Sequence, residues 1–319
     1  MSTTVPPELR SVRDWLRYAL TRLNETDVAC GHGFVEPFDE AVYLVCHTLQ
    51  LPHERLELFL DARLTAAEAA RLADLLQQRC AERVPLAYLT GEAWLGPYRF
   101  RCDRRALVPR SFIAALLDTD PLADDGYDRL EATVDRPWLE DSARIVQVLD
   151  LCAGSGCLAI VAAHTFPDAL VDAVDLSPEA LALAAENVAD HGLETRIELL
   201  QGDLFAPVAG RRYDLIVCNP PYVDALAMAE LPAEYRHEPE LGLAAGDDGM
   251  DLVRRILRDA SAHLRSRGWL LVEVGERRET VEALWPDIPL LWPMTPAGDG
   301  VVFAVSASAL AAAQRAGQV

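Results

Sequence analysis

The sequence predicts an α/β protein in which a largely parallel sheet follows a small helical domain and a β-hairpin. From residue 144 onward, apolar runs typical of buried strands alternate with stretches typical of helices. Residues 8–80 instead repeat apolar positions at helical spacing. The stretch between these parts is rich in glycine, proline and aromatic side chains, which favours a hairpin. We therefore expect a helical domain over 1–83, a hairpin linker over 84–110 and a larger α/β domain over 111–319.

The helical domain should contain three helices. Val12, Trp15 and Ala19 fall on one face of the first helix. The second helix is expected over 39–51, and the third over 65–80. Thr65 is a plausible N-cap of the third helix, because a hydroxyl there accepts a hydrogen bond from a free amide. These features alone describe a helical bundle without chemistry of its own.

The larger domain should alternate strands with helices. Parallel strands end at one edge of a sheet, and ligands of such sheets bind there. Ser177-Pro178 should begin a helix, because serine caps free amides and proline suits the first turn. The expected helices cover 158–164, 177–191 and 251–265, and the expected strands cover 145–151, 170–175, 197–200, 214–218, 269–274 and 301–305.

The composition limits the class of partner. The formal net charge is −21, and all 29 basic residues are arginines, so the chain has no general attraction to a nucleic-acid backbone. Such a charge suits a basic partner, or serves solubility alone. No apolar run reaches the ~20 residues that cross a bilayer, and residues 1–10 do not resemble a signal peptide. We expect a cytoplasmic protein without membrane contact.

Two further compositional features have no predicted chemistry. The seven cysteines are scattered and include no CxxC, which argues against a metal site and a disulfide framework. Residues 118–141 carry nine acidic residues against two arginines and show little core signal. They are predicted to form an acidic surface loop.

A glycine-rich turn follows the first expected strand, at 150–157. Gly154 and Gly156 lack Cβ atoms where the chain turns sharply, which lets a ligand approach the backbone. Asp175 stands at the end of the next strand, where a carboxylate can accept hydrogen bonds from both hydroxyls of a ribose. The pattern predicts a Rossmann-like nucleotide site. By itself, it does not separate a dinucleotide from S-adenosylmethionine.

The fourth expected strand runs into Asn-Pro-Pro-Tyr at 219–222, and this motif carries the chemistry. Two prolines fix the backbone and lack amide donors, which leaves carbonyl acceptors. Asn219 adds a side-chain carbonyl, and Tyr222 offers a face to a flat group. This set suits an NH2 on a planar system. Asn219, Pro220 and Tyr222 are therefore the predicted catalytic residues of an S-adenosylmethionine-dependent methyltransferase that acts on an amide-type nitrogen.

At this point the chain resembles the HemK/PrmC-PrmB group of protein glutamine-N5 methyltransferases. The resemblance covers nearly the whole chain and includes the Arg-x-Pro-x-Ala-Tyr-Leu stretch at 83–89, Val-Pro-Arg at 108–110 and the order of the later motifs. Gly-His-Gly at 31–33, Ser111 and the segment 219–249 resemble the PrmB branch. This branch implies that the substrate is a glutamine of large-subunit ribosomal protein three, that S-adenosylmethionine is the methyl donor, and that 1–83 recognises the substrate.

The resemblance also implies which residues meet each ligand. Residues 219–222 would hold the glutamine, with Glu238 and Pro239 as part of the wall behind them. The expected substrate-binding residues are therefore Asn219, Pro220, Pro221, Tyr222, Glu238 and Pro239. The expected cofactor-binding residues are Asp150, Cys152, Ala153, Gly154, Ser155, Gly156, Asp175, Leu176, Asp203, Leu204 and Asn219.

Three other functions are compatible with parts of this pattern. Asn-Pro-Pro-Tyr motifs also serve adenine-N6 methylation of nucleic acid, but such enzymes present basic patches, and this chain is acidic. A release factor is the substrate of the other branch, and the PrmB-like segments argue against it. A ribosome-assembly factor without catalysis would not need Asn219 and Asp175. His32, His237 and Glu273 are interpreted as structural residues.

Overall fold

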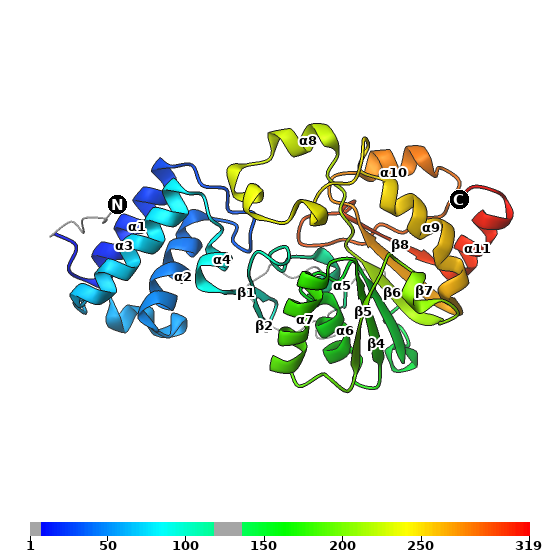
Figure 1. The fold of residues 1–319 in the computed structure, drawn as a ribbon, viewed down its shortest axis with the longest axis horizontal. Helices are drawn as coiled ribbons and strands as arrows, with labels where there is room; N and C mark the ends of the chain where they lie inside the picture. Colours follow the sequence, from blue (N-terminus) through cyan, green and yellow to red (C-terminus); the bar gives the residue numbers. More distant parts are fainter. Residues whose placement is uncertain (1–7, 118–135) are drawn as a thin grey trace.

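The computed structural model describes residues 8–117 and 136–319 and consists of a helical part joined to an α/β part (Figure 1). Thr65 caps its helix as predicted, because its hydroxyl accepts from the Glu68 amide while the Glu68 carboxylate accepts from the Thr65 amide at 2.7 Å. Trp15 and Leu23 lie in the core of this part. Its main helices are α1 (Val12–Glu25), α2 (Pro37–Leu49) and α3 (Ala66–Ala81), with a 3-10 helix η1 (His53–Phe59) between the last two.

A hairpin follows, built from β1 (Glu92–Leu95) and β2 (Tyr98–Arg101). The sequence did not predict the short helix that precedes it, α4 (Leu86–Thr90). Asn187 fastens the hairpin to the larger domain, since its side chain accepts from the Arg101 amide at 2.7 Å and donates to the Ser155 carbonyl at 3.0 Å. Asn187 therefore bridges the hairpin and the glycine-rich turn.

The α/β part is built on a six-stranded sheet with strand order β5-β4-β3-β6-β7-β8. Neighbouring strands are parallel except for the last pair, in which β8 runs antiparallel to β7. All six expected strands are present; the strand at 170–175 has the predicted bounds, and the other five differ at one or both ends. Their bounds are β3 (Gln147–Leu151), β4 (Leu170–Asp175), β5 (Ile197–Gln201), β6 (Tyr213–Cys218), β7 (Leu264–Glu273) and β8 (Val302–Ser306).

Helices cover both faces of this sheet, because alternate strand residues point to opposite sides. Val148 packs with α5 and α6 on one face, and Leu149 packs with α9 and α11 on the other. None of the described helices is long and apolar enough to span a membrane. The helices are α5 (Phe112–Leu117), α6 (Cys157–Thr165), α7 (Pro178–Asp190), α8 (Ala225–Glu230), α9 (Asp251–His263), α10 (Arg278–Leu284) and α11 (Ala307–Arg315).

The predicted acidic loop at 118–141 needs a partial correction. Residues 118–135 lie outside the described residues. At the end of the segment, however, Trp138 is buried, with its indole N–H donating to the Leu116 carbonyl at 3.2 Å and its ring meeting Trp269 at a centroid distance of 6.0 Å. A buried aromatic side chain anchors this end of the segment despite the acidic residues around it.

A long excursion, residues 224–243, leaves the sheet after Asn-Pro-Pro-Tyr and returns beside it. Val223 pairs with Ala244 in a parallel bridge, so the two ends of the excursion lie together. Between its ends, the excursion passes from the α/β part toward the helical part (Figure 1). It contains α8 and the 3-10 helices η4 (Ala233–His237) and η5 (Glu240–Gly242).

Candidate active site

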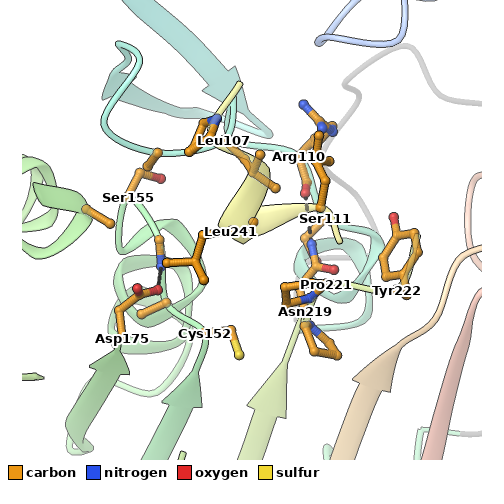
Figure 2. A pocket seen from close by; sticks show the side chains of 18 of the residues that line it. Leu107, Arg110, Ser111, Cys152, Ser155, Asp175, Asn219, Pro221, Tyr222 and Leu241 are labelled. Atoms are coloured by element: carbon orange, nitrogen blue, oxygen red, sulfur yellow. Dashed lines mark hydrogen bonds between the residues drawn. The ribbon is translucent and has the colours of Figure 1, made fainter. Parts of the chain in front are cut away.

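A cavity of about 800 Å³ lies at the carboxyl ends of the parallel strands (Figure 2). This is the edge at which open α/β sheets bind ligands. The structure brings most of the predicted site residues to this cavity. Those that line it are Asp150, Cys152, Ala153, Gly154, Ser155, Asp175, Leu176, Asp203, Leu204, Asn219, Pro220, Pro221, Tyr222 and Pro239; Gly156 and Glu238 are not among its lining residues.

The glycine-rich turn has the backbone that its sequence predicts. Gly154 and Gly156 have φ angles of 54° and 77°, in the left-handed region that favours glycine. Gly156 is the N-cap of α6, and a Cβ there would come within 3.1 Å of the Ala184 side chain. Gly156 is therefore required for close packing against α7. Cys152 also has a left-handed backbone, at φ 60°, and forms part of the cavity wall.

Asp175 is held at the end of β4 by backbone donors. One carboxylate oxygen accepts from the Gly154 amide at 2.7 Å, and the other accepts from the Ser177 amide at 2.8 Å (Figure 2). Burial raises the pKa of Asp175, and these donors oppose the rise. Each oxygen keeps a further lone pair, so the carboxylate can also accept from two adjacent hydroxyls.

The buried carboxyl group of Asp150 shows whether the cavity suits S-adenosylmethionine. Its side chain is fully buried, and burial raises its pKa to about 8. One oxygen accepts from the Ala159 amide at 2.9 Å, whereas the other has no hydrogen-bond partner among the described residues. A buried oxygen without a partner is costly unless a ligand supplies a donor. The ammonium group of an amino-acid moiety supplies such a donor, and the residues present therefore fit this cofactor.

Asn219 follows β6 directly and has a defined orientation. Its side-chain NH2 donates to the backbone carbonyl of Arg110 at 3.3 Å (Figure 2). A carbonyl oxygen only accepts, so the amide must present nitrogen to Arg110. The Asn219 carbonyl oxygen is thereby left for a ligand. No residue of the described ranges donates to the Pro220 carbonyl, which leaves a second acceptor at the same position.

Tyr222 completes the motif as a half-buried ring at the cavity wall. Burial raises its pKa, so the phenol is neutral at physiological pH. Gly275 lies against this ring, since a Cβ at Gly275 would approach it to 2.8 Å. The loop after β7 therefore fixes the ring position from behind.

Glu273 supports the linker from the end of β7. The carboxylate accepts from the Ser111 hydroxyl at 2.6 Å and from the Phe112 amide at 2.9 Å. Burial raises its pKa to about 7. The interpretation of Glu273 as a structural residue agrees with these contacts. His237 also makes structural contacts, to Arg104 at 3.0 Å and to the Glu82 carbonyl at 2.8 Å.

Glu238, a predicted substrate-binding residue, is held by donors from other segments of the chain and does not itself line the cavity. Its buried carboxylate accepts from the Val108 amide at 2.9 Å, from both terminal nitrogens of Arg110 at 2.6 and 2.7 Å, and contacts His32 at 3.3 Å. These donors outweigh the effect of burial and lower its pKa to about 2. Val108 and Arg110 line the cavity whereas Glu238 does not, so Glu238 meets the site through these two residues. Its neighbour Pro239 does line the cavity.

Sequence reasoning missed several residues of the wall. Leu107 and Leu241 lie above the space between Asp175 and Asn219 (Figure 2). Leu241 is 55% exposed, so part of its apolar surface is open to a ligand. Arg110 was noted only as part of a motif. The excursion has too little periodicity to predict that it returns over the strand ends.

A second hollow, of about 790 Å³, opens beside the cavity. It shares Arg105, Ser177 and Pro239 with the cavity wall. Its rim carries three carboxylates, those of Glu82, Asp103 and Glu179, and the guanidinium groups of Arg104 and Arg105. Carboxylates next to the site can attract a basic ligand.

The fold and the site together define an S-adenosylmethionine-dependent methyltransferase. Residues 137–233 match the family model of the methyltransferase small domain, and residues 14–91 match that of the PrmC N-terminal domain. The ribosomal protein uL3 glutamine methyltransferase of Burkholderia pseudomallei is 51% identical over 97% of this chain and 99% of its own. The chain belongs to the family of ribosomal protein uL3 glutamine methyltransferases.

Other relatives have the same name. The ribosomal protein uL3 glutamine methyltransferase of Bordetella pertussis is 52% identical over 89% of this chain and 91% of its own. That of Neisseria gonorrhoeae is 48% identical over 93% of this chain and 94% of its own. Among solved structures, the hMettl16 catalytic domain in complex with MAT2A 3'UTR hairpin 1 has a TM-score of 0.49 at 15% identity, over 83% of this chain and 90% of that chain.

Proposed function

We propose that this protein transfers a methyl group from S-adenosylmethionine to the side-chain amide nitrogen of a glutamine in ribosomal protein uL3. The observation that carries the proposal is the orientation of Asn219, whose NH2 is bonded to Arg110 and whose carbonyl oxygen is left as an acceptor. The named function of relatives about half identical over nearly the whole chain supports the choice of substrate.

The site supplies what an amide nitrogen needs. Such a nitrogen is a poor nucleophile, because its lone pair is delocalised into the carbonyl. Its two N–H groups match two acceptors, the Asn219 side-chain oxygen and the Pro220 carbonyl. As the new carbon–nitrogen bond forms, the nitrogen gains positive charge, and both acceptors then bind it more strongly. The extra proton leaves the nitrogen after transfer, so no dedicated base is required.

The cofactor supplies the methyl group on a positively charged sulfur. We propose that Asp150 holds its amino group, that Asp175 holds its ribose hydroxyls, and that residues 152–156 form the turn around it. Asp203 and Leu204 line the cavity near the end of β5 and are proposed to meet the adenine. Tyr222 would lie flat against the glutamine amide. Much of the rate should come from this positioning of the two reactants.

The charge of the chain suits the proposed substrate. The formal net charge of −21 favours encounter with an arginine- and lysine-rich ribosomal protein. We propose that 1–83 recognises this substrate, that 84–110 links it to the catalytic domain at 111–319, and that the reaction takes place in the cytoplasm, where ribosomes are assembled. The same charge weighs against a nucleic-acid substrate.

One experiment tests the proposal directly. The protein is incubated with labelled S-adenosylmethionine and the ribosomal proteins of cells that lack the enzyme, and the label is located by mass spectrometry. We expect one methyl group on a glutamine of uL3. Label on nucleic acid, on a release factor alone, or on no macromolecule would overturn the proposed function.

A further inference from the structure

Four side chains form a closed ring between the helical domain and the active site. His32 contacts Glu238 at 3.3 Å, and Glu238 accepts from both terminal nitrogens of Arg110. The Arg110 guanidinium lies 5.4 Å from the centre of the Tyr235 ring, and the Tyr235 ring lies 4.4 Å from that of His32. Each member therefore contacts two others. Glu238 is fully buried and His32 is 5% exposed, so little water competes for these contacts.

The ring reaches the reacting groups in two ways. The backbone carbonyl of Arg110 accepts the Asn219 NH2, so the position of Arg110 sets the direction of the Asn219 oxygen. Tyr235 itself lines the cavity. His32 and Glu238 contact both of these residues, Arg110 through Glu238 and Tyr235 through His32.

Contacts of Glu234 hold the excursion at a fixed position on the helical domain. One oxygen of Glu234, four residues before Glu238, accepts from the Ala29 amide, from Arg79 and from Arg83, each at 3.0 Å. Glu234 is fully buried. The turn that carries Tyr235 is thus bonded to the helical domain before it, through Glu234, and after it, through Glu238. A displacement of His32 should therefore also displace Tyr235 and Arg110.

We propose that His32 is a positioning residue for methyl transfer: with Glu238 it fixes Arg110 and Tyr235, and through them the orientation of Asn219. The inference deepens the proposed function and rests on it. The Gly-His-Gly turn of the helical domain is then part of the machinery that orients the glutamine, in addition to any contact with the rest of the substrate. A displacement of the reacting groups by about 1 Å costs on the order of 10²-fold in rate.

The sharpest test uses the space beside Gly31. Gly31 lies outside the left-handed backbone region, and a Cβ there would meet the Tyr235 hydroxyl oxygen at 2.5 Å but the next ring atom only at 3.6 Å. Gly31→Ala should therefore push Tyr235 without removing a hydrogen bond. We expect kcat for uL3 methylation to fall about 10- to 100-fold. Adding Tyr235→Phe removes the clashing oxygen and should restore kcat to the level of Tyr235→Phe alone.

The outcomes separate positioning from folding. Full activity in Gly31→Ala, or no recovery in the double variant, would overturn the inference, and so would the loss of activity in Tyr235→Phe alone, because the hydroxyl would then act on the substrate itself. The wild-type protein is assayed in parallel. If it does not methylate uL3, the proposed function fails, whereas an active wild type with an unaffected Gly31→Ala variant refutes the positioning role alone.

Variants of His32 give an independent measurement. His32→Leu removes the contact with Glu238, whereas His32→Gln keeps an N–H donor of similar reach. We expect kcat to fall strongly in the first and to recover in part in the second, with the KM for uL3 and the affinity for S-adenosylmethionine little changed. His53→Ala, an exposed histidine of the same domain, is the matched control. Equal losses in His32→Leu and His32→Gln, or a rise in KM alone, would contradict positioning.

Discussion

Asn219 and Arg110 are joined by a hydrogen bond of 3.3 Å in which the asparagine side chain donates to the arginine backbone carbonyl. The two residues are far apart in sequence: one ends the hairpin linker and the other follows β6. Because the Asn219 NH2 donates to Arg110, the Asn219 oxygen is left as an acceptor. The linker therefore sets the orientation of the asparagine amide.

The first prediction concerns Asn219 itself. Asn219→Ala removes an acceptor that we propose to bind the substrate's amide nitrogen, with an interaction that strengthens as positive charge develops on that nitrogen. We expect methyl transfer to fall by about 10²- to 10³-fold, as for other preorganised polar groups. Calorimetry should show that S-adenosylmethionine still binds. Asn24→Ala, at an exposed asparagine of α1, serves as the control. Full activity of Asn219→Ala would refute the role given to this residue.

Gly275 provides a second prediction, because its missing Cβ leaves room for Tyr222. Gly275→Ala would bring a methyl group within 2.8 Å of the ring at a φ of 54°. We expect kcat to fall about 10-fold or more as the ring shifts. Gly210→Ala has a similar backbone strain, at φ 82°, but meets no atom within 4 Å. It should lose stability without a loss of kcat, and equal kcat losses in the two variants would contradict the steric explanation.

The sequence predicted most of the fold because the relevant signals are local. The strand before Asn219 contains the apolar run 215–218, which leads directly into the motif, and Thr65 lies three residues before a glutamate. The cofactor side of the site was predictable for the same reason. Gly154 and Asp175 occupy the ends of consecutive strands, and parallel topology then places them together.

The part that the sequence did not predict depends on contacts between distant segments. Glu238 was assigned to the substrate wall, yet its four donors come from His32, Val108 and Arg110, more than a hundred residues away. Trp138 is buried, but the acidic residues around it led to the prediction of a surface loop. In both cases contacts with residues distant in sequence outweigh the local composition, and no periodic pattern predicts those contacts.

Asp150 leads to a prediction about pH. Its pKa is raised from 3.8 to about 8 in the folded protein. The stability that this group contributes is therefore present below about pH 4 and is lost as the pH rises through about 8. The asparagine of Asp150→Asn cannot ionise. The melting temperature of the variant should therefore rise relative to that of the wild type as the pH increases from 5 to 9. The exposed Asp287→Asn is the control. A difference that does not change with pH would argue against a buried, neutral Asp150.

Arg79 yields a prediction about stability. It is 2% exposed and bridges two buried carboxylates, those of Glu40 and Glu234. Arg79→Met would leave the buried Glu40 without its cation and Glu234 with Arg83 alone, and breaking a buried ion pair in this way costs about 3–5 kcal/mol. Arg13→Met breaks the exposed pair with Asp61 and should cost less than about 1 kcal/mol. Both free energies of unfolding can be measured by urea titration. Similar values for the two variants would show that the buried network contributes no more than a surface pair.

The last prediction asks where the acidic charge acts. If carboxylates steer a basic substrate, kcat/KM for uL3 should fall as salt screens them, while kcat should change little. Glu82 and Glu179 stand on the rim of the hollow beside the active site, so a Glu82→Gln/Glu179→Gln variant should have a lower kcat/KM at low salt and a weaker salt dependence.

The matched control neutralises the same amount of charge far from the rim. Glu54→Gln/Glu57→Gln removes two exposed carboxylates from the 3-10 helix of the helical domain. Because the field of a charge decays over about 8 Å at physiological salt, local steering requires a larger effect from the rim pair than from this pair. Equal effects would assign the attraction to net charge alone. A wild-type kcat/KM that is independent of salt would remove electrostatic steering altogether.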